Sequence, residues 1–373
     1  MEYIAWFSLL LLVGYILLIF IYHIGWLLIK PFALPSSLSP KHTFSILIPA
    51  RNEAAVIEQC LQSIVGNHYP DFLFEVIVID DYSTDETAQV VQQFIHHYSN
   101  FNIRLIQMKD DTQQRKLKKA AITAAIEQAT GSYIILTDAD CTRGSNWLKT
   151  IDAFIQTNEA KMVYAPVAFS AKNIFEKIQS LEFSGLVGIG ASAIRLKNPN
   201  MCSAANLIFE KNVFNEVNGY VGNDGVASGD DEFLLHKVFK VYPNNVYFLK
   251  HKQAIVYTSP NASVTQLTEQ RRRWVSKSTK YENRYITAIM VGAYLFNFFI
   301  LFNLIFNPWI GLTMLAIKTF FEGAFLWSIQ RLFNQTHLLL LLPVAEIFHI
   351  VYVLVIGIWG NVGTYNWKGR DLK

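Results

Sequence analysis

Runs of apolar residues divide the chain into two kinds of region. Near both ends the runs reach the length of about 20 residues that crosses a bilayer, and they cover residues 4–29, 285–306 and 338–359. Between residues 43 and 283 the apolar runs are short and alternate with stretches of helical periodicity. The pattern therefore predicts membrane helices at both ends of the chain and an α/β domain in the middle.

The middle region contains four short apolar runs that predict buried strands, at residues 44–48, 74–79, 103–106 and 133–136. Helical patterns separate them, at residues 53–65, 85–97 and 116–129. This alternation predicts a mostly parallel sheet covered by helices on both faces. Ligands in such sheets bind beyond the carboxyl ends of the strands, so polar residues directly after each run are the candidate site residues.

The N-terminal apolar run is predicted to be a membrane helix and not a cleaved signal peptide. No basic stretch precedes it, it is too long for a signal peptide, and no small-x-small cleavage site follows it. Glu2 is the only charged side chain before the run, whereas Lys30 and Lys41 follow it. The positive-inside rule then places the N-terminus outside and the middle domain in the cytoplasm of a multi-pass protein of the inner (plasma) membrane.

The number of C-terminal spans stays open. Residues 309–329 are long enough to cross a bilayer, but Lys318 and Glu322 lie on one helical face at i and i+4. Three C-terminal spans would place the basic tail outside, whereas two would keep it inside, as the positive-inside rule favours, and would make residues 309–329 interfacial or re-entrant. The chain therefore divides into an N-terminal transmembrane helix at residues 1–31 and a cytosolic α/β domain at 43–283. A C-terminal transmembrane region of two or three spans follows at 284–362, and a basic tail at 363–373.

Composition supports a membrane protein. Hydrophobic residues make up 52% of the 373 residues and charged residues 16%, against about 25% charged in average soluble domains, and the mean hydropathy is +0.24. The net charge of +3 is too small to indicate a nucleic-acid partner. Cys60, Cys141 and Cys202 are odd in number and far apart, which predicts reduced thiols and neither a disulfide framework nor a zinc site.

The first acidic cluster, Asp80–Asp81, ends the second predicted strand. A plain helix start with Ser83 or Thr84 as its N-cap would explain the acid at Asp85, because negative charge is favourable in the first turn. It would not explain two adjacent acids at the strand exit. A carboxylate in this place can accept a hydrogen bond from the imide N–H of uracil or from a ribose hydroxyl.

The second cluster, Asp138–Ala139–Asp140, follows the fourth predicted strand. Its spacing lets two carboxylates reach one hard cation, and Mg²⁺ and Mn²⁺ prefer oxygen ligands and bridge to phosphate oxygens. An isolated Asp-x-Asp is usually a solvated turn. The position at the end of an apolar strand favours the metal site.

The third cluster, Asp230–Asp231, precedes an apolar helical run. Acids are favoured at a helix start by the macrodipole, and an ionised acid in that place is also suited to act as a general base. Asp231 is the candidate base and Asp230 its neighbour. The two interpretations are compatible.

A basic segment, Gln270–Arg271–Arg272–Arg273–Trp274, lies in a polar helical stretch at residues 263–280. A basic face on anionic lipid would explain such a segment before a membrane span. Arg273 and Trp274 fit a narrower role, because a guanidinium binds a diphosphate in bidentate fashion and an indole offers a flat face to a sugar. Lys118 and Lys119 also fit phosphate binding, and solvated surface lysines are an equal alternative.

Together these motifs resemble the family 2 glycosyltransferases, in particular the membrane-bound branch with cellulose, chitin and hyaluronan synthases and ceramide glucosyltransferase. The resemblance covers about residues 43–275 and rests on Pro49–Ala50–Arg51–Asn52–Glu53, Asp80–Asp81, Thr137–Asp138–Ala139–Asp140, Asp230–Asp231 and the Gln-x-x-Arg-Trp pattern of Gln270, Arg273 and Trp274. One departure is Asp230, where many relatives have Glu; the charge is kept. The segment Trp367–Lys368–Gly369–Arg370 is a weaker match.

The resemblance implies a GT-A fold, a Rossmann-like α/β nucleotide-sugar domain with a mostly parallel sheet, flanked by transmembrane helices. It further implies a nucleotide-diphosphate sugar donor, with uridine as the expected base, a Mg²⁺ or Mn²⁺ ion at Asp138 and Asp140, and transfer with inversion by a hexosyltransferase. Asp231 matches the catalytic base. The donor-binding residues it implies are Pro49, Ala50, Arg51, Glu53, Asp80, Asp81, Lys118, Asp138, Gln270 and Arg273, and the acceptor-binding residues are Gln270 and Trp274.

Two enzymatic functions and one non-enzymatic function compete. The Gln-x-x-Arg-Trp pattern favours a processive polysaccharide synthase, whereas the small number of spans favours a transferase that adds a sugar to a membrane lipid, such as a ceramide-like or polyprenyl-type acceptor. A nucleotide-binding scaffold without activity would predict a damaged acidic set, and every acid is present. Membrane-associated sugar transfer in polysaccharide synthesis is therefore the first expectation, and lipid glycosylation is the alternative.

Overall fold

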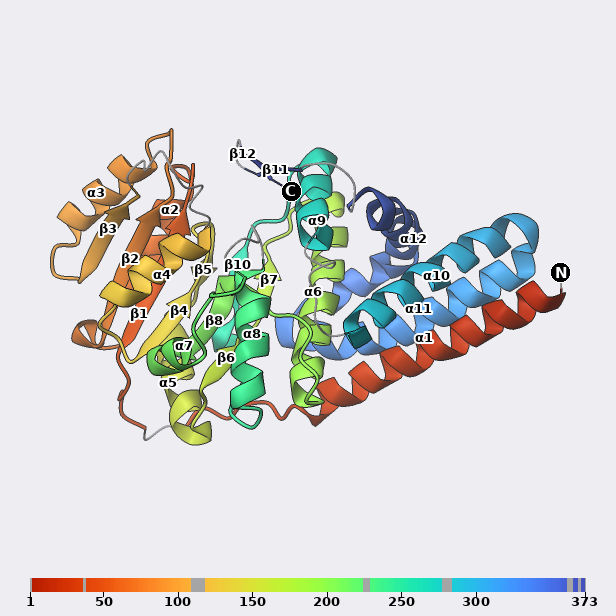
Figure 1. Ribbon diagram of the computed structural model, residues 1–373, viewed down its shortest axis with the longest axis horizontal. Helices are drawn as coiled ribbons and strands as arrows, with labels where there is room; N and C mark the ends of the chain where they lie inside the picture. The colour runs from red at the N-terminus through yellow and green to blue at the C-terminus, as the bar shows by residue number, and fades with distance from the viewer. Residues whose placement is uncertain are drawn as a thin grey trace. The chain divides into compact units, whose positions relative to one another are not determined.

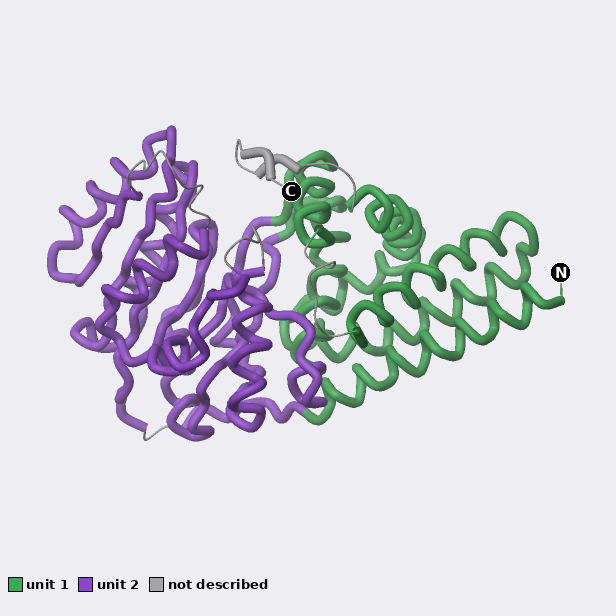
Figure 2. The backbone as a smooth tube through the Cα atoms, viewed as in Figure 1, with its two compact units in different colours: residues 1–28, 171–192, 260–373 green, residues 29–170, 193–259 purple. Residues whose placement is uncertain are grey.

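The computed structural model of the protein describes residues 2–35, 38–108, 118–223, 229–276, 284–360, 365–367 and 370–372. Two compact units are interleaved along the chain (Figure 2). The sheet unit comprises Ile29–Ser170 and Ala193–Ser259, and the helical unit comprises Met1–Leu28, Ala171–Ser192 and Pro260–Lys373. Parts of the middle region, residues 171–192 and 260–276, thus group with the helices at the chain ends.

The sheet unit is built on a seven-stranded sheet of order β3-β2-β1-β4-β8-β6-β9 (Figure 1). Only β8 runs antiparallel to its neighbours, so the sheet is mostly parallel, as predicted. The strands are β1 (Phe44–Ala50), β2 (Phe74–Asp80), β3 (Ile103–Gln107), β4 (Tyr133–Leu136), β6 (Met162–Tyr164), β8 (Leu207–Glu210) and β9 (Val246–Phe248). A second sheet consists of β5 (Thr142–Arg143), β10 (Val256–Thr258) and β7 (Val167–Phe169).

All four strands predicted from the apolar runs are present, as β1 to β4. Every residue of β2 is buried, which explains why residues 76–79 are continuously apolar and do not alternate. The helices of this unit are α2 (Ile57–Val65), α3 (Thr87–His97), α4 (Lys118–Gln128), α5 (Trp147–Asn158), α7 (Lys211–Glu216) and α8 (Asp230–Val241), with short 3₁₀ turns η1 (Asp71–Leu73), η2 (Ala204–Asn206) and η3 (Lys252–Ala254). All three cysteines are buried free thiols.

In the helical unit, α1, α10 and α11 run side by side (Figure 1). A core of Leu12, Phe296, Ile300, Met314 and Ile350 joins them to α12. The elements are α1 (Glu2–Leu28), α6 (Ile174–Arg195, whose last turn belongs to the sheet unit), α9 (Val264–Ser276), α10 (Arg284–Phe306), α11 (Pro308–Phe333), η5 (Thr336–Leu341), α12 (Leu342–Trp359), β11 (Tyr365–Trp367) and β12 (Arg370–Leu372).

Within the described residues, four helical segments are long and apolar enough to cross a membrane: Glu2–Leu28, Arg284–Phe306, Pro308–Phe333 and Thr336–Trp359. The third of these, Pro308–Phe333, contains Lys318 and Glu322. These two charges left open whether the segment crosses the membrane. Those charges are satisfied inside the unit, because the Lys318 Nζ atom lies 2.8 Å from Glu322 Oε1 and also pairs with Glu346 of α12. Charged groups inside a membrane face the bundle interior and pair with one another, so α11 qualifies as a span. The side of the C-terminus stays a prediction.

The Lys318 ion-pair cluster is expected to be essential for the stability of the helical unit. Lys318 is 0% exposed, and Tyr15 of α1 donates a hydrogen bond to Glu322, so three helices meet at this cluster. Replacing Lys318 by Met would leave two carboxylates without their cation and is expected to cost about 3–5 kcal/mol. Unfolding of the purified protein in detergent measures the loss.

The exposed lysine Lys240 of α8 supplies the control, and Lys240→Met is expected to change stability by less than about 0.5 kcal/mol. A variant in which Lys318, Glu322 and Glu346 are all replaced by apolar residues should recover stability relative to Lys318→Met, because no buried charge is then unpaired. Equal stability of Lys318→Met and the wild type would contradict the assignment.

Candidate active site

The ends of β1 and β2 bring the first two motifs together. The two strands are parallel and in register, with Ala50 opposite Asp80, and the Asp81 N–H donates to the Ala50 carbonyl at 2.8 Å. Pro49 and Ala50 are the last residues of β1, so the predicted donor-binding segment begins at the carboxyl edge of the sheet. This is the edge at which ligands bind in open α/β sheets.

Arg51 and Asp80 hold the two loops in place. The Arg51 Nη1 group donates to the carbonyls of Asp81 and Tyr82, at 2.7 and 2.9 Å, and Asp80 Oδ1 accepts from the Ser83 N–H at 3.0 Å. Asp80 and Asp81 are 5% and 3% exposed. Arg51 and Asp80 thus shape the loop that presents Asp81, which remains the candidate for contact with the base.

The start of α3 differs from the plain helix start with Ser83 or Thr84 as its N-cap. Ser83 and Thr84 precede the helix without capping it, and Asp85 accepts from the Thr87 N–H at 3.0 Å and from the Ala54 N–H at 3.1 Å. The carboxylate reaches both amides because the loop that carries Glu53 lies against the start of α3; the Glu53 N–H donates to Thr87 Oγ1 at 2.8 Å. Such a contact between two loops has no signal in local sequence.

Asp138 and Asp140 follow β4 and form one acidic group. Oxygen atoms of both residues and the Cys141 sulfur lie within 4.8 Å of one another. The Asp138 side chain is 43% exposed, and Asp140 Oδ2 accepts from the Thr258 hydroxyl at 2.6 Å. Burial and the two carboxylates raise the pKa of the Cys141 thiol well above its usual value. Hard divalent cations prefer oxygen to sulfur ligands, so the two carboxylates are the candidate cation ligands.

Two residues that support this loop were not identified from the sequence. Arg143 of β5 donates to the Cys141 carbonyl at 2.7 Å and to Thr137 Oγ1 at 3.2 Å, and it packs on the Trp147 ring at 4.9 Å. Thr258 of β10 orients Asp140 from the neighbouring strand of the same small sheet. Thr258 is 118 residues from its partner, so no spacing rule could have found it.

Asp231 lies in the first turn of α8 with its carboxylate fixed in place. Its Oδ2 atom accepts from the Ala204 N–H at 3.1 Å and its Oδ1 atom from the Glu232 N–H at 2.9 Å. Backbone N–H donors at a helix start favour the ionised carboxylate. The residue is only partly buried, which suits a base that must meet an acceptor hydroxyl.

Lys118 joins two of the predicted motifs. Its Nζ atom lies 3.5 Å from Asp138 Oδ1 and 3.5 Å from Asp230 Oδ2, so the acidic group after β4 and the start of α8 lie beside one ammonium group. Its neighbour Lys119 is 2% exposed, donates to the Asn223 carbonyl at 2.7 Å and lies over the Phe233 ring. Neither Lys118 nor Lys119 is therefore a solvated surface lysine, so that alternative is wrong. Lys119 has a structural role.

The basic segment lies on α9 in the helical unit, and its three arginines have different surroundings. Arg271 is 1% exposed and pairs with Glu182 at 2.8 Å. Arg272 pairs with Glu269 at 3.3 Å and lies over Trp359 at 5.0 Å. The guanidinium of Arg273 makes no ion pair within the described residues, so it is available for an anionic ligand.

Gln270 and Trp274 lie on the same helix, and each is held by a neighbour in the helical unit. The Gln270 Oε1 atom accepts from Asn261 Nδ2 at 3.0 Å. The Trp274 ring lies 4.2 Å from the Arg271 guanidinium and 6.4 Å from the Phe183 ring. Trp274 is partly buried. Lys277 and Lys280, which favoured a lipid-binding face, lie outside the described residues.

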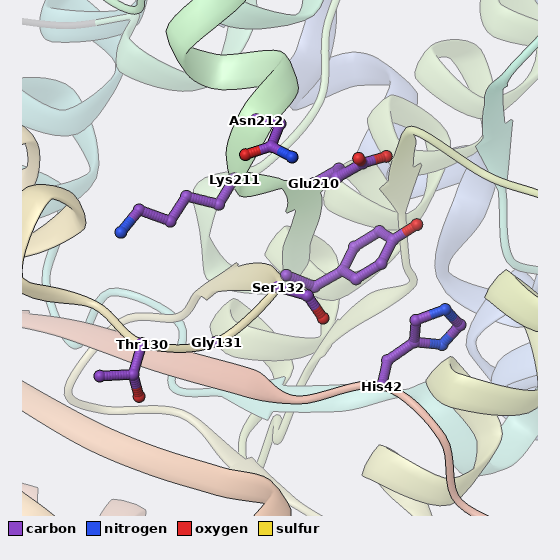
Figure 3. A pocket seen from close by; sticks show the side chains of 8 residues that line it. His42, Thr130, Gly131, Ser132, Glu210, Lys211 and Asn212 are labelled. Carbon is purple, nitrogen blue, oxygen red and sulfur yellow. The ribbon is translucent and has the colours of Figure 1, made fainter.

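A cavity of about 390 Å³ in the sheet unit lies at the opposite edge of the sheet, where β1 and β4 begin and β8 ends (Figure 3). Its lining includes His42, Ser132 and Glu210, and it contains no residue of the predicted motifs. Figure 3 shows Lys211 and Asn212 on the adjoining helix start. This cavity is therefore not the candidate active site.

Comparison with curated proteins finds glycosyltransferases. The chain is 28% identical to the glycosyltransferase AglE of Haloferax volcanii over 50% of this chain and 58% of that protein. It is 24% identical to a dolichyl N-acetyl-alpha-D-glucosaminyl phosphate 3-beta-D-2,3-diacetamido-2,3-dideoxy-beta-D-glucuronosyltransferase of Methanococcus voltae over 54% of this chain and 64% of that protein. The chain thus spans less than two thirds of the length of these relatives.

Comparison with solved structures shows the fold. The mannosyltransferase PcManGT from Pyrobaculum calidifontis, solved in complex with GDP-Man and Mn²⁺, superposes with a TM-score of 0.57 over 94% of this chain and 98% of that chain, at 17% identity. The predicted GT-A architecture, a mostly parallel α/β sheet accompanied by apolar helices, is confirmed. Residues 45–217 match the family described as glycosyl transferase family 2.

Proposed function

We propose that the protein transfers a sugar from a nucleotide-diphosphate sugar to a membrane-associated acceptor, with inversion and with a divalent cation, in polysaccharide synthesis. The observation that carries the proposal is the position of Lys118, whose ammonium group lies 3.5 Å from both Asp138 and Asp230. A single cation beside both acids brings the proposed metal site close to the first turn of α8, which also carries the proposed base Asp231. A sugar donor bound there would present its reacting carbon between them.

The donor site in this proposal lies at the carboxyl edge of β1, β2 and β4. Asp81 accepts from the base, which we propose to be uracil, while Arg51 and Asp80 keep the surrounding loop in shape. Pro49, Ala50 and Glu53, at or just after the end of β1, contact the donor in this proposal. Lys118 is close enough to Asp138 to meet a phosphate that binds beside it.

The acidic group after β4 fits a hard divalent cation. The two carboxylates have oxygen atoms within 4.8 Å of each other and offer oxygen ligands, which Mg²⁺ and Mn²⁺ prefer. When bound there, the cation would neutralise charge on the departing diphosphate. Asp138 and Asp140 would hold it, and Thr258 and Arg143 would keep these two side chains and their loop in place.

The chemical step we propose is a single displacement. Asp231 accepts the proton of the acceptor hydroxyl, whose oxygen attacks the anomeric carbon from the face opposite the diphosphate. The bond from that carbon to the diphosphate breaks, and the nucleoside diphosphate leaves. Trp274 and Gln270 support the acceptor, and Arg273 stabilises the negative charge that grows on the leaving group.

The role of Arg273 leads to a testable prediction. Arg273→Ala is expected to lower kcat by about 10²- to 10³-fold, the usual loss when one charge-stabilising donor is removed. Arg273→Lys should recover only part of the rate, because an ammonium group lacks the planar bidentate fork. Turnover of labelled donor by protein in nanodiscs measures both variants.

Arg272→Ala is the control on the same helix, since Arg272 already pairs with Glu269 and Trp359. A smaller loss for Arg273→Ala than for Arg272→Ala would contradict the assignment of the leaving-group role to Arg273.

A second candidate function is glycosylation of a membrane lipid. The name of the Methanococcus voltae relative describes transfer onto a dolichyl-linked sugar, and only four helices of the described residues are apolar enough to span a membrane. Protein in nanodiscs, given Mn²⁺, radiolabelled nucleotide sugars and bacterial lipid, separates the two functions. Label in a large water-soluble product supports polysaccharide synthesis, and label in one species of the organic phase supports lipid glycosylation.

A further inference from the structure

One face of α6 carries the side chains that hold the acceptor-side segment of α9. Gln179, Glu182 and Phe183 stand at i, i+3 and i+4, which places them on the same side of the helix. Glu182 pairs with Arg271, and Phe183 lies against Trp274. All of these residues belong to the helical unit, so their mutual geometry is fixed within one compact part of the molecule.

Gln179 reaches the same segment through Asn261. The Gln179 Oε1 atom accepts from the Asn261 N–H at 3.0 Å, and Gln179 Nε2 donates to the Asn261 carbonyl at 2.9 Å. The amide of Asn261 then donates to Gln270 Oε1 at 3.0 Å. Both residues assigned to the acceptor side, Gln270 and Trp274, are thus connected to α6 by specific polar or aromatic contacts.

Arg271 is the central group of this arrangement. It is 1% exposed, its Nη2 atom lies 2.8 Å from Glu182 Oε2, and its guanidinium lies 4.2 Å from the Trp274 ring and 5.9 Å from the Tyr352 ring of α12. An apolar side chain of similar size would fill this space without the desolvation cost of a buried charge. Filling space therefore does not explain an arginine here, whereas orienting an indole by a cation–π contact does.

Arg271 and Phe183 both contact the Trp274 ring, at 4.2 and 6.4 Å. Trp274 is only partly buried as a residue, so these contacts do not enclose it completely. An exposed aromatic face supports a sugar or other acceptor group only if its orientation is constant, because the free energy of immobilising the ring otherwise opposes binding.

We propose that Glu182 and Arg271 are positioning residues: Glu182 fixes Arg271, and Arg271 fixes the Trp274 ring that supports the acceptor. The inference rests on the proposed function, which assigns Trp274 to the acceptor side. Neither residue touches donor or metal in this proposal. Their loss is therefore expected to affect the transfer step and to leave nucleotide binding intact.

The first readout is the state of the Trp274 ring. The protein has eight tryptophans; labelled with 5-fluorotryptophan in nanodiscs, it gives ¹⁹F resonances of which Trp274→Phe identifies one. Glu182→Gln and Arg271→Lys are expected to shift or broaden that resonance. Glu269→Gln, which removes a carboxylate from the same helix that pairs with Arg272 at 3.3 Å, should leave it unchanged.

The second readout is the rate of transfer with the nucleotide sugar that the wild type uses. Glu182→Gln is expected to lower kcat about tenfold, while the donor KM and the affinity for UDP or GDP stay within about twofold. The double variant Glu182→Gln/Arg271→Lys should be no slower than Arg271→Lys alone, because both changes interrupt one chain of contacts. Unfolding temperatures of all variants are measured in the same nanodiscs.

An unchanged Trp274 resonance in Glu182→Gln, or a changed resonance with an unchanged kcat, would overturn the positioning role. Asp231→Asn separates this from failure of the proposed function. If Asp231→Asn retains transfer, the assignment of the active site fails whatever Glu182→Gln does. If Asp231→Asn is inactive and Glu182→Gln transfers at the wild-type rate, only the positioning inference fails.

Discussion

Replacing Asp231 by Asn is expected to lower sugar transfer by about 10³-fold, which is the middle of the range for loss of a general base. Asn has the same shape and can still accept a hydrogen bond from the Ala204 or Glu232 N–H that now fixes the carboxylate. The fold should therefore survive, and the affinity for nucleotide should not change. What is lost is the ability to take a proton from the acceptor hydroxyl.

The control for this variant is Asp71→Asn, which removes an exposed carboxylate of the same unit at η1. Transfer and nucleotide affinity of Asp71→Asn should match the wild type. The two quantities separate the possible roles of Asp231: loss of transfer with intact nucleotide binding supports the base, whereas parallel loss of both would show that Asp231 binds the donor. Retained turnover in Asp231→Asn would contradict its role as base.

Replacing Asp140 by Asn is the second large-effect prediction. Its carboxylate is oriented by the Thr258 hydroxyl at 2.6 Å and lies beside Asp138. Loss of an outer-shell partner alone typically costs 10- to 100-fold in metal affinity, so removal of a direct carboxylate ligand is expected to weaken Mn²⁺ binding by at least about 100-fold. Electron paramagnetic resonance of Mn²⁺ titrated into purified protein measures the affinity directly.

Activity provides an independent check on the same variant. If Asp140 holds the cation, transfer by Asp140→Asn should recover partly as Mn²⁺ is raised, whereas transfer by Asp231→Asn should not respond. Thr258→Val should weaken Mn²⁺ binding less than Asp140→Asn, because it removes only the group that orients Asp140. Identical Mn²⁺ titrations of wild type and Asp140→Asn would exclude Asp140 as a ligand.

The parts of the fold that depend on local pattern were predictable. Four apolar runs became β1 to β4, and Asp80 and Asp138 stand at or just after strand ends because the runs stop there. The apolar segments near both ends became α1, α10 and α12 for the same reason. In each case the element is one continuous segment of the chain. Its burial requires apolar residues, and these can be recognised in the sequence.

The parts that depend on distant contacts were not predictable. In the sequence, the charges of Lys318 and Glu322 argued against a membrane span. Their partners Tyr15 and Glu346 lie on other helices, and sequence spacing does not show that these helices meet. The sequence does not distinguish Lys119 from its neighbour Lys118. The structure does, because the Asn223 carbonyl and the Phe233 ring lie beside Lys119. The roles of the site residues themselves remain predictions that the variants above address.

The most direct test of the central claim is a donor assay on the full chain in nanodiscs. Wild type, Asp231→Asn and Asp140→Asn are incubated with Mn²⁺, bacterial lipid and a panel of radiolabelled nucleotide sugars, and transfer of label from donor to product is measured. The account predicts transfer from one donor by the wild type and less than about 1% of that rate in Asp231→Asn. It predicts a lowered rate in Asp140→Asn that recovers partly as Mn²⁺ is raised. Transfer by the variants at the wild-type rate, or no transfer from any nucleotide sugar by the wild type, would contradict it.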